Sequence, residues 1–499
     1  MKTIDSQKKD NCIGFFFIVS AISLFIFFVT QCFSNDIWYD EVYSMVMSSC
    51  SYREIVEITA KDVHPPFYYF YLKTIEKIAL FFMPAFSKVI IAKIATLLPY
   101  IGIGIYSMTL VRKHFGIKSA GMFLLFIMAM PQLPFYALEI RMYSLALFLI
   151  TAAFLHAYEI ICGNSRKHFI PVFIYGILTA YTQYFACIAI VGVYLALLLY
   201  GIRNRRQNNY LRTWGICVGL SVVSYLPWLP ILKEQMSAVA GGYWIEPMSI
   251  RSIFGCLKFI FLPVSYDFII DYILAVCMIL ICAGVFLYYL RKDHTDKWHF
   301  FAFSAIGIPT LIIVVSFVFS IAGHPIFVYR YLVPALGIVW LFIAVLLTRE
   351  GKRWQILLWI PFLLAGYFNL KGFYVEENKK IEQMELTQEA LTELPKDAVI
   401  VANFDHVQAV TAYYLEQDVY LYGNETLPLV EKILPNTKSV PDGKELAKLL
   451  QTKDVYFFGS FTAREELLQE WEEYGIASEE RGSYLLERYW FNLYHLEEK

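Results

Sequence analysis

The chain has 499 residues, of which 58% are hydrophobic and 17% are charged, whereas about a quarter of the residues of a soluble domain carry a charge. This balance argues against a soluble protein, and a formal net charge of -1 without a basic run argues against a nucleic-acid-binding protein. Most of the nine cysteines fall inside apolar stretches and no CxxC pair occurs, so we expect neither a disulfide framework nor a zinc site.

Apolar segments long enough to cross a membrane recur up to residue 371. A helix needs about twenty apolar residues to cross the hydrocarbon core, and on that criterion we expect about eleven spanning helices. They are predicted near residues 13-33, 89-111, 119-136, 142-162, 169-183, 186-202, 211-232, 268-290, 300-321, 331-348 and 354-371. The first run follows Lys8 and Lys9 and has no small-residue cleavage site, so we interpret it as a retained signal anchor.

Lysine and arginine residues fall in alternate short loops between these segments. Basic pairs stand at 112-113, 166-167 and 291-292, and further basic clusters stand at 203-206 and 349-353. Because basic loops remain in the cytoplasm, the pattern predicts a cytoplasmic amino terminus and an extracytoplasmic carboxyl end in the cell membrane.

Residues 34-88 then form the first outer loop. From Phe67 to Met83 this loop is long and aromatic, but Lys73, Glu76 and Lys77 share one helical face. Counting it as a further span would also place the next basic pair outside. We therefore expect an amphipathic helix at the outer interface, one of two helices that this loop holds beside the membrane.

The sequence changes character after residue 371, where glutamate and lysine become frequent. Short β-branched runs alternate with helical stretches, at 398-401, 419-422 and 455-458. No GxGxxG or GxxxxGK[ST] loop occurs among them, so nothing indicates a nucleotide. We expect a transmembrane domain over 1-371 and a small extracytoplasmic α/β domain over 372-499.

Two adjacent carboxylates, Asp40 and Glu41, stand just beyond the first predicted span, in the sequence WYDE. The ordinary explanation is an aromatic residue at the membrane interface followed by a helix cap. A general base is the alternative, because a hydroxyl is a weak nucleophile until a carboxylate accepts its proton. The pattern by itself favours the cap.

His64 lies farther along the same loop, directly before Pro65 and Pro66. A stiff turn that begins a helix explains the two prolines. It explains the histidine less well, since an imidazole at such a junction could donate a hydrogen bond to an anionic leaving group. Both explanations stay open.

Two arginines stand on the outer side against the prevailing charge bias. Arg141 lies between the third and fourth spans in the sequence EIRMY, and Arg330 lies before the tenth span in YRYLVPAL. Residues two apart do not face each other on a helix, so Glu139 and Arg141 are not explained as a simple ion pair. The arginines could extend to the lipid headgroups, or they could clamp a phosphate, which suits a planar guanidinium.

Taken in order, the motifs WYDE, HPPFYY, EIRMYSL and YRYLVPAL resemble those of glycosyltransferase family 39-like membrane proteins. That family belongs to the GT-C superfamily, together with the related protein O-mannosyltransferases and the lipid A aminoarabinose transferase. The resemblance covers about residues 13-370 and implies a polytopic helical fold of the GT-C type. The chain departs from the family pattern QEARMY at Leu138 and Ile140, which affects the local helix packing more than the chemistry.

The resemblance implies a glycosyltransferase in which Asp40 is the base that activates the acceptor and Glu41 is its neighbour. The substrate-binding residues that it implies are His64, Glu139, Arg141, Tyr143 and Arg330. The implied reaction is an inverting transfer of a sugar, from a polyprenyl phosphate to a hydroxyl of a glycan, lipid or protein. It implies no cofactor and no metal, although the two adjacent carboxylates would also suit a divalent cation, as in some other GT-C enzymes.

A polytopic chain could instead be a transporter or a flippase of lipid-linked glycans. Such a protein would carry charged residues near the bilayer midplane and an internal repeat, and the predicted spans favour neither. A third alternative is an inactive binding protein that recruits envelope partners. Residues 241-246, GGYWIE, would suit a loop that closes over the acceptor, although an interfacial loop anchored by aromatic residues explains them more simply.

Overall fold

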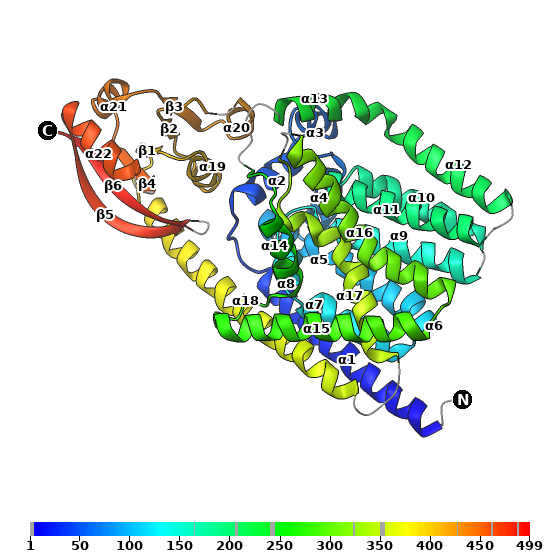
Figure 1. Cartoon of the computed structure of the whole chain (residues 1–499). Coiled ribbons are helices and arrows are strands. Elements are labelled where there is room, and N and C mark those ends of the chain that lie inside the picture. The colour runs from blue at the N-terminus through cyan, green and yellow to red at the C-terminus, as the bar shows by residue number, and fades with distance from the viewer. Residues whose placement is uncertain are drawn as a thin grey trace. The chain divides into compact units, whose positions relative to one another are not determined.

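The computed structural model describes residues 4-163, 165-204, 208-239, 245-322, 325-349, 355-426, 428-460, 463-486 and 489-499. Residues 241-244 of the predicted acceptor loop lie outside these ranges. The chain forms two compact units (Figure 1). The helical unit comprises Met1–Phe33, Tyr52–Ile75 and Lys93–Phe373, and the sheet unit comprises Ser34–Ser51, Glu76–Ala92 and Tyr374–Lys499.

Long apolar helices dominate the part of the chain that the structure describes, and nine of them are long and apolar enough to cross a membrane. They span Asp10–Gln31 in α1, Lys88–Phe115 in α5 to α6, Tyr143–Gly163 (α9), Tyr184–Arg203 (α11), Asn209–Ser237 in α12 and α13, Phe268–Lys292 (α15), Asp296–Ile321 (α16), Tyr329–Thr348 in η4 and α17, and Gln355–Thr392 (α18). The prediction of a polytopic helical membrane protein is confirmed.

Two of the predicted spans are shorter helices. The segment predicted at 119-136 contains α7 (Ile117–Ala129) and α8 (Leu133–Leu138), which are separated at Gln132, where φ is 69°. The segment predicted at 169-183 contains α10 (Phe169–Ala180). A helix of 13 residues, such as α7, is only about 20 Å long at 1.5 Å per residue. Apolar composition located both segments, but not the turns that end these helices.

The core of the helical unit lies around α17 (Val333–Thr348), in which every residue is buried. Gly337 of α17 allows a close approach to α9, because a Cβ atom at that position would stand 1.9 Å from the Thr151 hydroxyl oxygen. Gly121 of α7 similarly packs against the backbone of α1 at Gly14. Small residues at such crossings let membrane helices pack closely. Most side chains of α15, in contrast, are not buried by the rest of the chain.

The first predicted outer loop contains three helices, α2 (Tyr39–Ser49), α3 (Tyr52–Thr59) and α4 (Phe67–Phe82). The helix expected from Phe67 is present as α4, but its polar residues are not all on the exposed face. Lys73 and Glu76 are 8% and 4% exposed, whereas Phe81 and Phe82 are 81% and 74% exposed. The expectation for that face is therefore corrected: α4 presents aromatic rings outward, and Glu76 accepts a hydrogen bond from the Ser48 hydroxyl at 2.9 Å.

The carboxyl-terminal part is an α/β fold with a six-stranded sheet of order β3-β2-β1-β4-β6-β5. The strands are β1 (Val399–Ala402), β2 (Val419–Tyr422), β3 (Thr437–Val440), β4 (Val455–Ser460), β5 (Ile476–Leu486) and β6 (Tyr489–Glu498). The intervening helices are α19 (Asp405–Tyr414), α20 (Pro428–Ile433), α21 (Gly443–Leu450) and α22 (Ala463–Glu473). β1 to β4 run parallel, and β5 and β6 form the antiparallel hairpin drawn in red (Figure 1).

The segment that contains the acidic pair belongs to the sheet unit. The Ile37 N–H donates to the Tyr414 hydroxyl at 3.0 Å, and Asp36 pairs with Lys380 at 2.9 Å. The rings of Tyr39 and His406 stack with centroids 3.9 Å apart. These contacts join residues 34-51, from the first predicted outer loop, to the carboxyl-terminal fold. The domain boundary at residue 371 stays a prediction.

Candidate functional site

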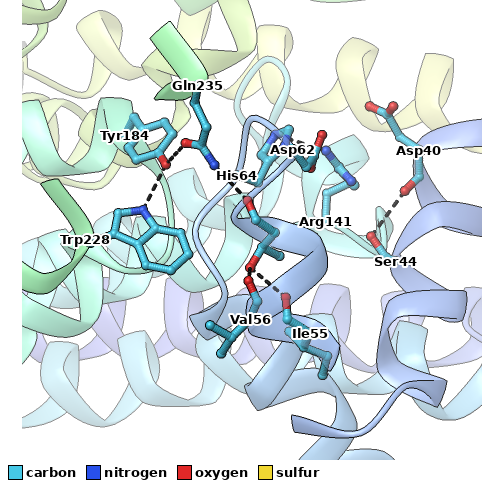
Figure 2. A network of polar contacts seen from close by, with 11 residues as sticks. Asp40, Ser44, Ile55, Val56, Asp62, His64, Arg141, Tyr184, Trp228 and Gln235 are labelled. Atoms are coloured by element: carbon cyan, nitrogen blue, oxygen red, sulfur yellow. Dashed lines mark hydrogen bonds and ion pairs between the residues drawn. The ribbon is translucent and has the colours of Figure 1, made fainter. Parts of the chain in front are cut away.

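His64 of the helical unit lies between the carboxylate of Asp62 and the guanidinium of Arg141. It follows the end of α3, and the Phe67 N–H just beyond it donates to the Tyr181 carbonyl at 2.9 Å, which fixes the start of α4. His64 Nδ1 lies 3.3 Å from Asp62 Oδ2, and His64 Nε2 lies 3.2 Å from Arg141 Nη2 (Figure 2). A guanidinium only donates, so Nε2 accepts and the ring proton on Nδ1 is donated to Asp62.

Arg141 lies in the tight turn between α8 and α9, and only 3% of it is exposed. Its N–H donates to the Glu139 carbonyl at 2.6 Å, so these two residues belong to a turn and not to one helix. Burying a guanidinium is costly unless it is hydrogen-bonded. The structure holds Arg141 against His64, which agrees better with a built contact than with an arginine that extends to the headgroups.

Tyr143 and Arg330 belong to the same neighbourhood. Tyr143 is 1% exposed, its ring lies 5.0 Å from that of Tyr136, and the charges of Arg330, Arg141 and Glu139 all act on its hydroxyl. The helical unit thus brings together all five predicted substrate-binding residues, His64, Glu139, Arg141, Tyr143 and Arg330.

A second layer of polar contacts holds the loop before His64. Gln235 Nε2 donates to the Thr59 carbonyl at 2.7 Å, and the Tyr184 hydroxyl donates to Gln235 Oε1. Trp228 Nε1 donates to the Tyr184 oxygen at 3.0 Å (Figure 2). The contributions of Asp62, Tyr184, Trp228 and Gln235 to the position of His64 were not predicted from the sequence. Only Asp62 carried a signal, because it stands two residues before His64.

The acidic pair occupies the first turn of α2 in the sheet unit. Glu41 is 2% exposed and its Oε2 accepts from the Trp38 N–H at 3.0 Å, so this carboxylate caps the helix. Asp40 is half-buried, and its carbonyl accepts from the Ser44 hydroxyl at 3.2 Å. Glu41 therefore performs the capping, as the ordinary explanation of the pair expects, and the role of Asp40 as a general base stays a prediction.

A cavity of about 560 Å³ lies in the helical unit beside Tyr329. Its walls include Arg251, Phe254 and Lys258 of α14 (Ile250–Phe261), together with Gln132. Arg251 and Lys258 are seven residues apart and both are exposed. The lining therefore combines two cations with aromatic rings, and it adjoins the residue before Arg330. Sequence reasoning did not identify it.

The described part of the chain holds no cluster of metal-ligating side chains. No group of three or more histidine, cysteine, aspartate or glutamate residues there could hold a metal ion. The residues that would remain for a cation are Asp40 and Glu41, of which Glu41 already caps α2.

Comparisons with known proteins agree with this architecture. The structure is similar to ArnT from Cupriavidus metallidurans in the apo state, with 13% sequence identity, a TM-score of 0.57, and coverage of 96% of this chain and 97% of ArnT. The same protein bound to undecaprenyl phosphate matches with 12% identity and the same TM-score and coverage. The mycobacterial arabinofuranosyltransferase AftD matches with a TM-score of 0.50 and 12% identity, over 97% of this chain and 40% of AftD.

No protein-family model matches the sequence, and no curated protein matches it. At these levels of identity the similar structures establish the fold. The chain shares the fold of these structures, a polytopic helical bundle, and it carries a carboxyl-terminal α/β domain, in agreement with the fold class predicted from the sequence.

Proposed function

We propose that this protein transfers a sugar from a polyprenyl-phosphate donor to an acceptor hydroxyl at the outer face of the cell membrane. The observation that carries the proposal is the buried Arg141, held against His64, with Arg330 in the same neighbourhood around Tyr143. Two guanidinium groups gathered near the end of an apolar bundle suit a phosphate that is attached to a lipid. The GT-C fold, and the undecaprenyl phosphate bound to ArnT, support the same donor class.

The donor would be bound in two parts. Arg141 and Arg330 contact the phosphate, and the cavity beside Tyr329 accommodates the adjoining prenyl groups with Arg251 and Lys258 at its rim. His64 has its proton on Nδ1, facing Asp62, so it does not donate to the phosphate directly. It keeps the Arg141 guanidinium in place, and this assignment replaces the expected hydrogen bond from His64 to the leaving group.

The reaction is a single displacement. Asp40 accepts the proton of the acceptor hydroxyl as its oxygen forms a bond to the anomeric carbon, and the bond from that carbon to the phosphate oxygen breaks. The leaving polyprenyl phosphate gains a negative charge, which Arg141 and Arg330 stabilise. The anomeric configuration inverts and no covalent intermediate forms. A hexose or a pentose fits this chemistry equally, and a divalent cation at Asp40 would assist the leaving phosphate.

The proposal includes a membrane orientation. The amino terminus is cytoplasmic and the domain over 372-499 is extracytoplasmic, because the basic loops at 112-113, 166-167 and 291-292 alternate along the chain. Nucleotide sugars are cytoplasmic, so an enzyme with its acidic loop outside needs a donor that a lipid has carried across. A glycan, a lipid or a protein exposed at the cell surface would then be the acceptor.

The donor class is tested directly with the purified protein in vesicles. Radiolabelled polyprenyl-phosphate sugars and the corresponding nucleotide sugars are each supplied with an envelope fraction, and the label in the polymer is counted. We expect transfer from the lipid-linked sugars alone. Transfer from nucleotide sugars, or no consumption of any lipid-linked hexose or pentose, would refute the proposal. Arg53→Ala is a suitable control variant, since Arg53 is 89% exposed and its pair with Glu57 lies on the surface.

A further inference from the structure

The carboxyl ends of β1 and β4 mark a reversal in the sheet unit. The chain builds outward from β1 to β2 and β3, and then returns to place β4 on the other side of β1. In open α/β sheets, ligands bind beyond the carboxyl ends of the strands at such a reversal. Residues 403-406, with the sequence NFDH, follow β1 at this edge, and Ser460 ends β4.

Hydrogen bonds hold this loop in place. Asn403 Nδ2 donates to the Ser460 carbonyl at 3.0 Å, and Asn403 Oδ1 accepts from the Ser460 N–H at 3.0 Å. Asp405 Oδ1 accepts from the His406 N–H at 2.9 Å. The side chains of Phe404, Asp405 and His406 are only half-buried. The backbone of the loop is therefore fixed, while its side chains still present accessible surface.

The same edge receives the helix that carries Asp40. The Tyr39 ring stacks on the His406 ring with centroids 3.9 Å apart and planes 10° apart, and the Phe404 ring lies 4.9 Å from that of His406. The charge of Asp40 acts on His406. The loop that follows β1 and the first turn of α2 thus meet within the sheet unit.

The chemistry of this surface favours an uncharged ligand rich in hydroxyl groups. Burial lowers the pKa of His406, against the opposing effect of Asp405 and Asp40, which favours the neutral imidazole. The aromatic rings of Tyr39 and Phe404 suit the apolar face of a sugar. The carboxylates of Asp40 and Asp405 can accept hydrogen bonds from hydroxyl groups, but they repel a phosphate or another carboxylate.

We propose that Tyr39, Asp40 and residues 404-406 bind the acceptor, and that this acceptor is an uncharged carbohydrate. This inference rests on the proposed function and extends that function, because it assigns the selection of the acceptor to the sheet unit. Binding at this edge brings a sugar hydroxyl to Asp40, which takes its proton during the transfer.

Two substitutions probe the surface with little change of shape. His406→Phe keeps a ring against Tyr39 but removes both ring nitrogens. Asp405→Asn keeps an oxygen for the His406 N–H but removes the charge. His495→Phe is the matched control, because His495 pairs with Asp454 at 2.7 Å and lies opposite Tyr456, near the amino end of β4.

The variants are reconstituted as full-length protein and supplied with radiolabelled polyprenyl-phosphate sugar. The acceptor is a neutral carbohydrate fraction, titrated by mass, from the envelope of cells that lack this protein. We expect the apparent KM for that fraction to rise about tenfold in His406→Phe and Asp405→Asn, while the donor KM changes by less than about twofold. His495→Phe should match the wild type in both constants.

The possible results separate the two proposals. An acceptor KM equal to that of the wild type in both variants overturns the inference and leaves the proposed function standing. A donor KM that rises in parallel with the acceptor KM also overturns it, since the edge would then serve general positioning. A wild-type protein that transfers sugar to the unfractionated envelope but not to the neutral fraction overturns the inference, whereas one that moves no sugar from any lipid-linked donor to either acceptor refutes the proposed function itself.

Discussion

Substitution of Arg141 gives the sharpest test of the phosphate contact. In Arg141→Ala the guanidinium is lost, and His64 Nε2 loses the donor that stands 3.2 Å away. In Arg141→Lys a positive charge remains, but the planar fork is replaced by a single ammonium group on a differently shaped side chain. The pair of variants therefore separates the charge from its geometry.

The size of the effect follows from the burial of Arg141, which is 3% exposed. Removing one preorganised donor from a developing negative charge lowers kcat by about 10²- to 10³-fold, or about 3–4 kcal/mol. For Arg141→Lys we expect a loss of about tenfold, equivalent to 1.4 kcal/mol. The buried hydrogen bond to His64 also contributes to folding, so Arg141→Ala should lower the stability by about 1–3 kcal/mol.

The assay is single-turnover transfer from a polyprenyl-phosphate sugar in vesicles, with thermal unfolding measured in parallel. Arg53→Ala should retain full activity and stability, because Arg53 is exposed and its pair with Glu57 is a surface contact. A folded Arg141→Ala protein with the kcat of the wild type would refute the reasoning. So would equal losses in the Lys and Ala variants, because the charge would then contribute nothing.

Three further predictions concern the surroundings of the site. Asp62→Asn keeps an oxygen that can accept from His64 Nδ1, which lies 3.3 Å from Asp62 Oδ2, but removes the negative charge. Accordingly, kcat should fall about tenfold or more while the donor KM stays constant; an unchanged kcat would show that the charge of Asp62 does not help His64 to position Arg141. Replacing both Arg251 and Lys258 by alanine should raise the donor KM about tenfold with little effect on kcat. Lys448→Ala, at an exposed position, is the control. A donor KM equal to that of this control would show that the cavity does not bind the donor. Gly337→Val places a Cβ 1.9 Å from the Thr151 hydroxyl oxygen and should lower the free energy of unfolding by about 1–3 kcal/mol. Gly215→Val, where no atom lies within 4 Å of the added Cβ, should lower it far less. Equal Tm values would show that α9 and α17 do not pack as described.

The helices were the most predictable part of the structure. Runs of apolar residues located every long helix, because a membrane span has to be apolar over most of its length. The breaks were harder to predict, since α7 ends before an extended Met130 and α8 begins after Gln132, where φ is 69°, and hydropathy encodes neither conformation. The continuation of α18 to Thr392 was also missed, because its second part is charged and no longer has the signal of a span.

The carboxyl-terminal domain was predicted from three β-branched runs, which are now β1, β2 and β4. β3 has two polar central residues, Lys438 and Ser439, and therefore lacked that signal. The β5 strand was missed for a similar reason, since most of its residues are only partly buried or exposed.

The residues of the candidate site were named from the sequence, but the contacts between those residues were not predicted. His64 and Arg141 stood out because each is unusual in its local sequence, and their mutual contact joins positions 77 residues apart. No spacing rule predicts such a contact. The role of Glu41 as a helix cap and the stacking of Tyr39 on His406 likewise depend on the folded chain.

Asp40→Asn in the reconstituted transfer reaction tests the central claim most directly. The substitution preserves the size of a half-buried side chain but removes its negative charge and with it the capacity to take a proton, so Asp418→Asn, at a partly exposed position of the same unit, is the natural control. We predict that Asp40→Asn still binds polyprenyl phosphate but transfers at least about 10²-fold less sugar, and that the wild-type product has the opposite anomeric configuration to the donor. Wild-type rates in Asp40→Asn, or retention of the donor configuration, would contradict the account.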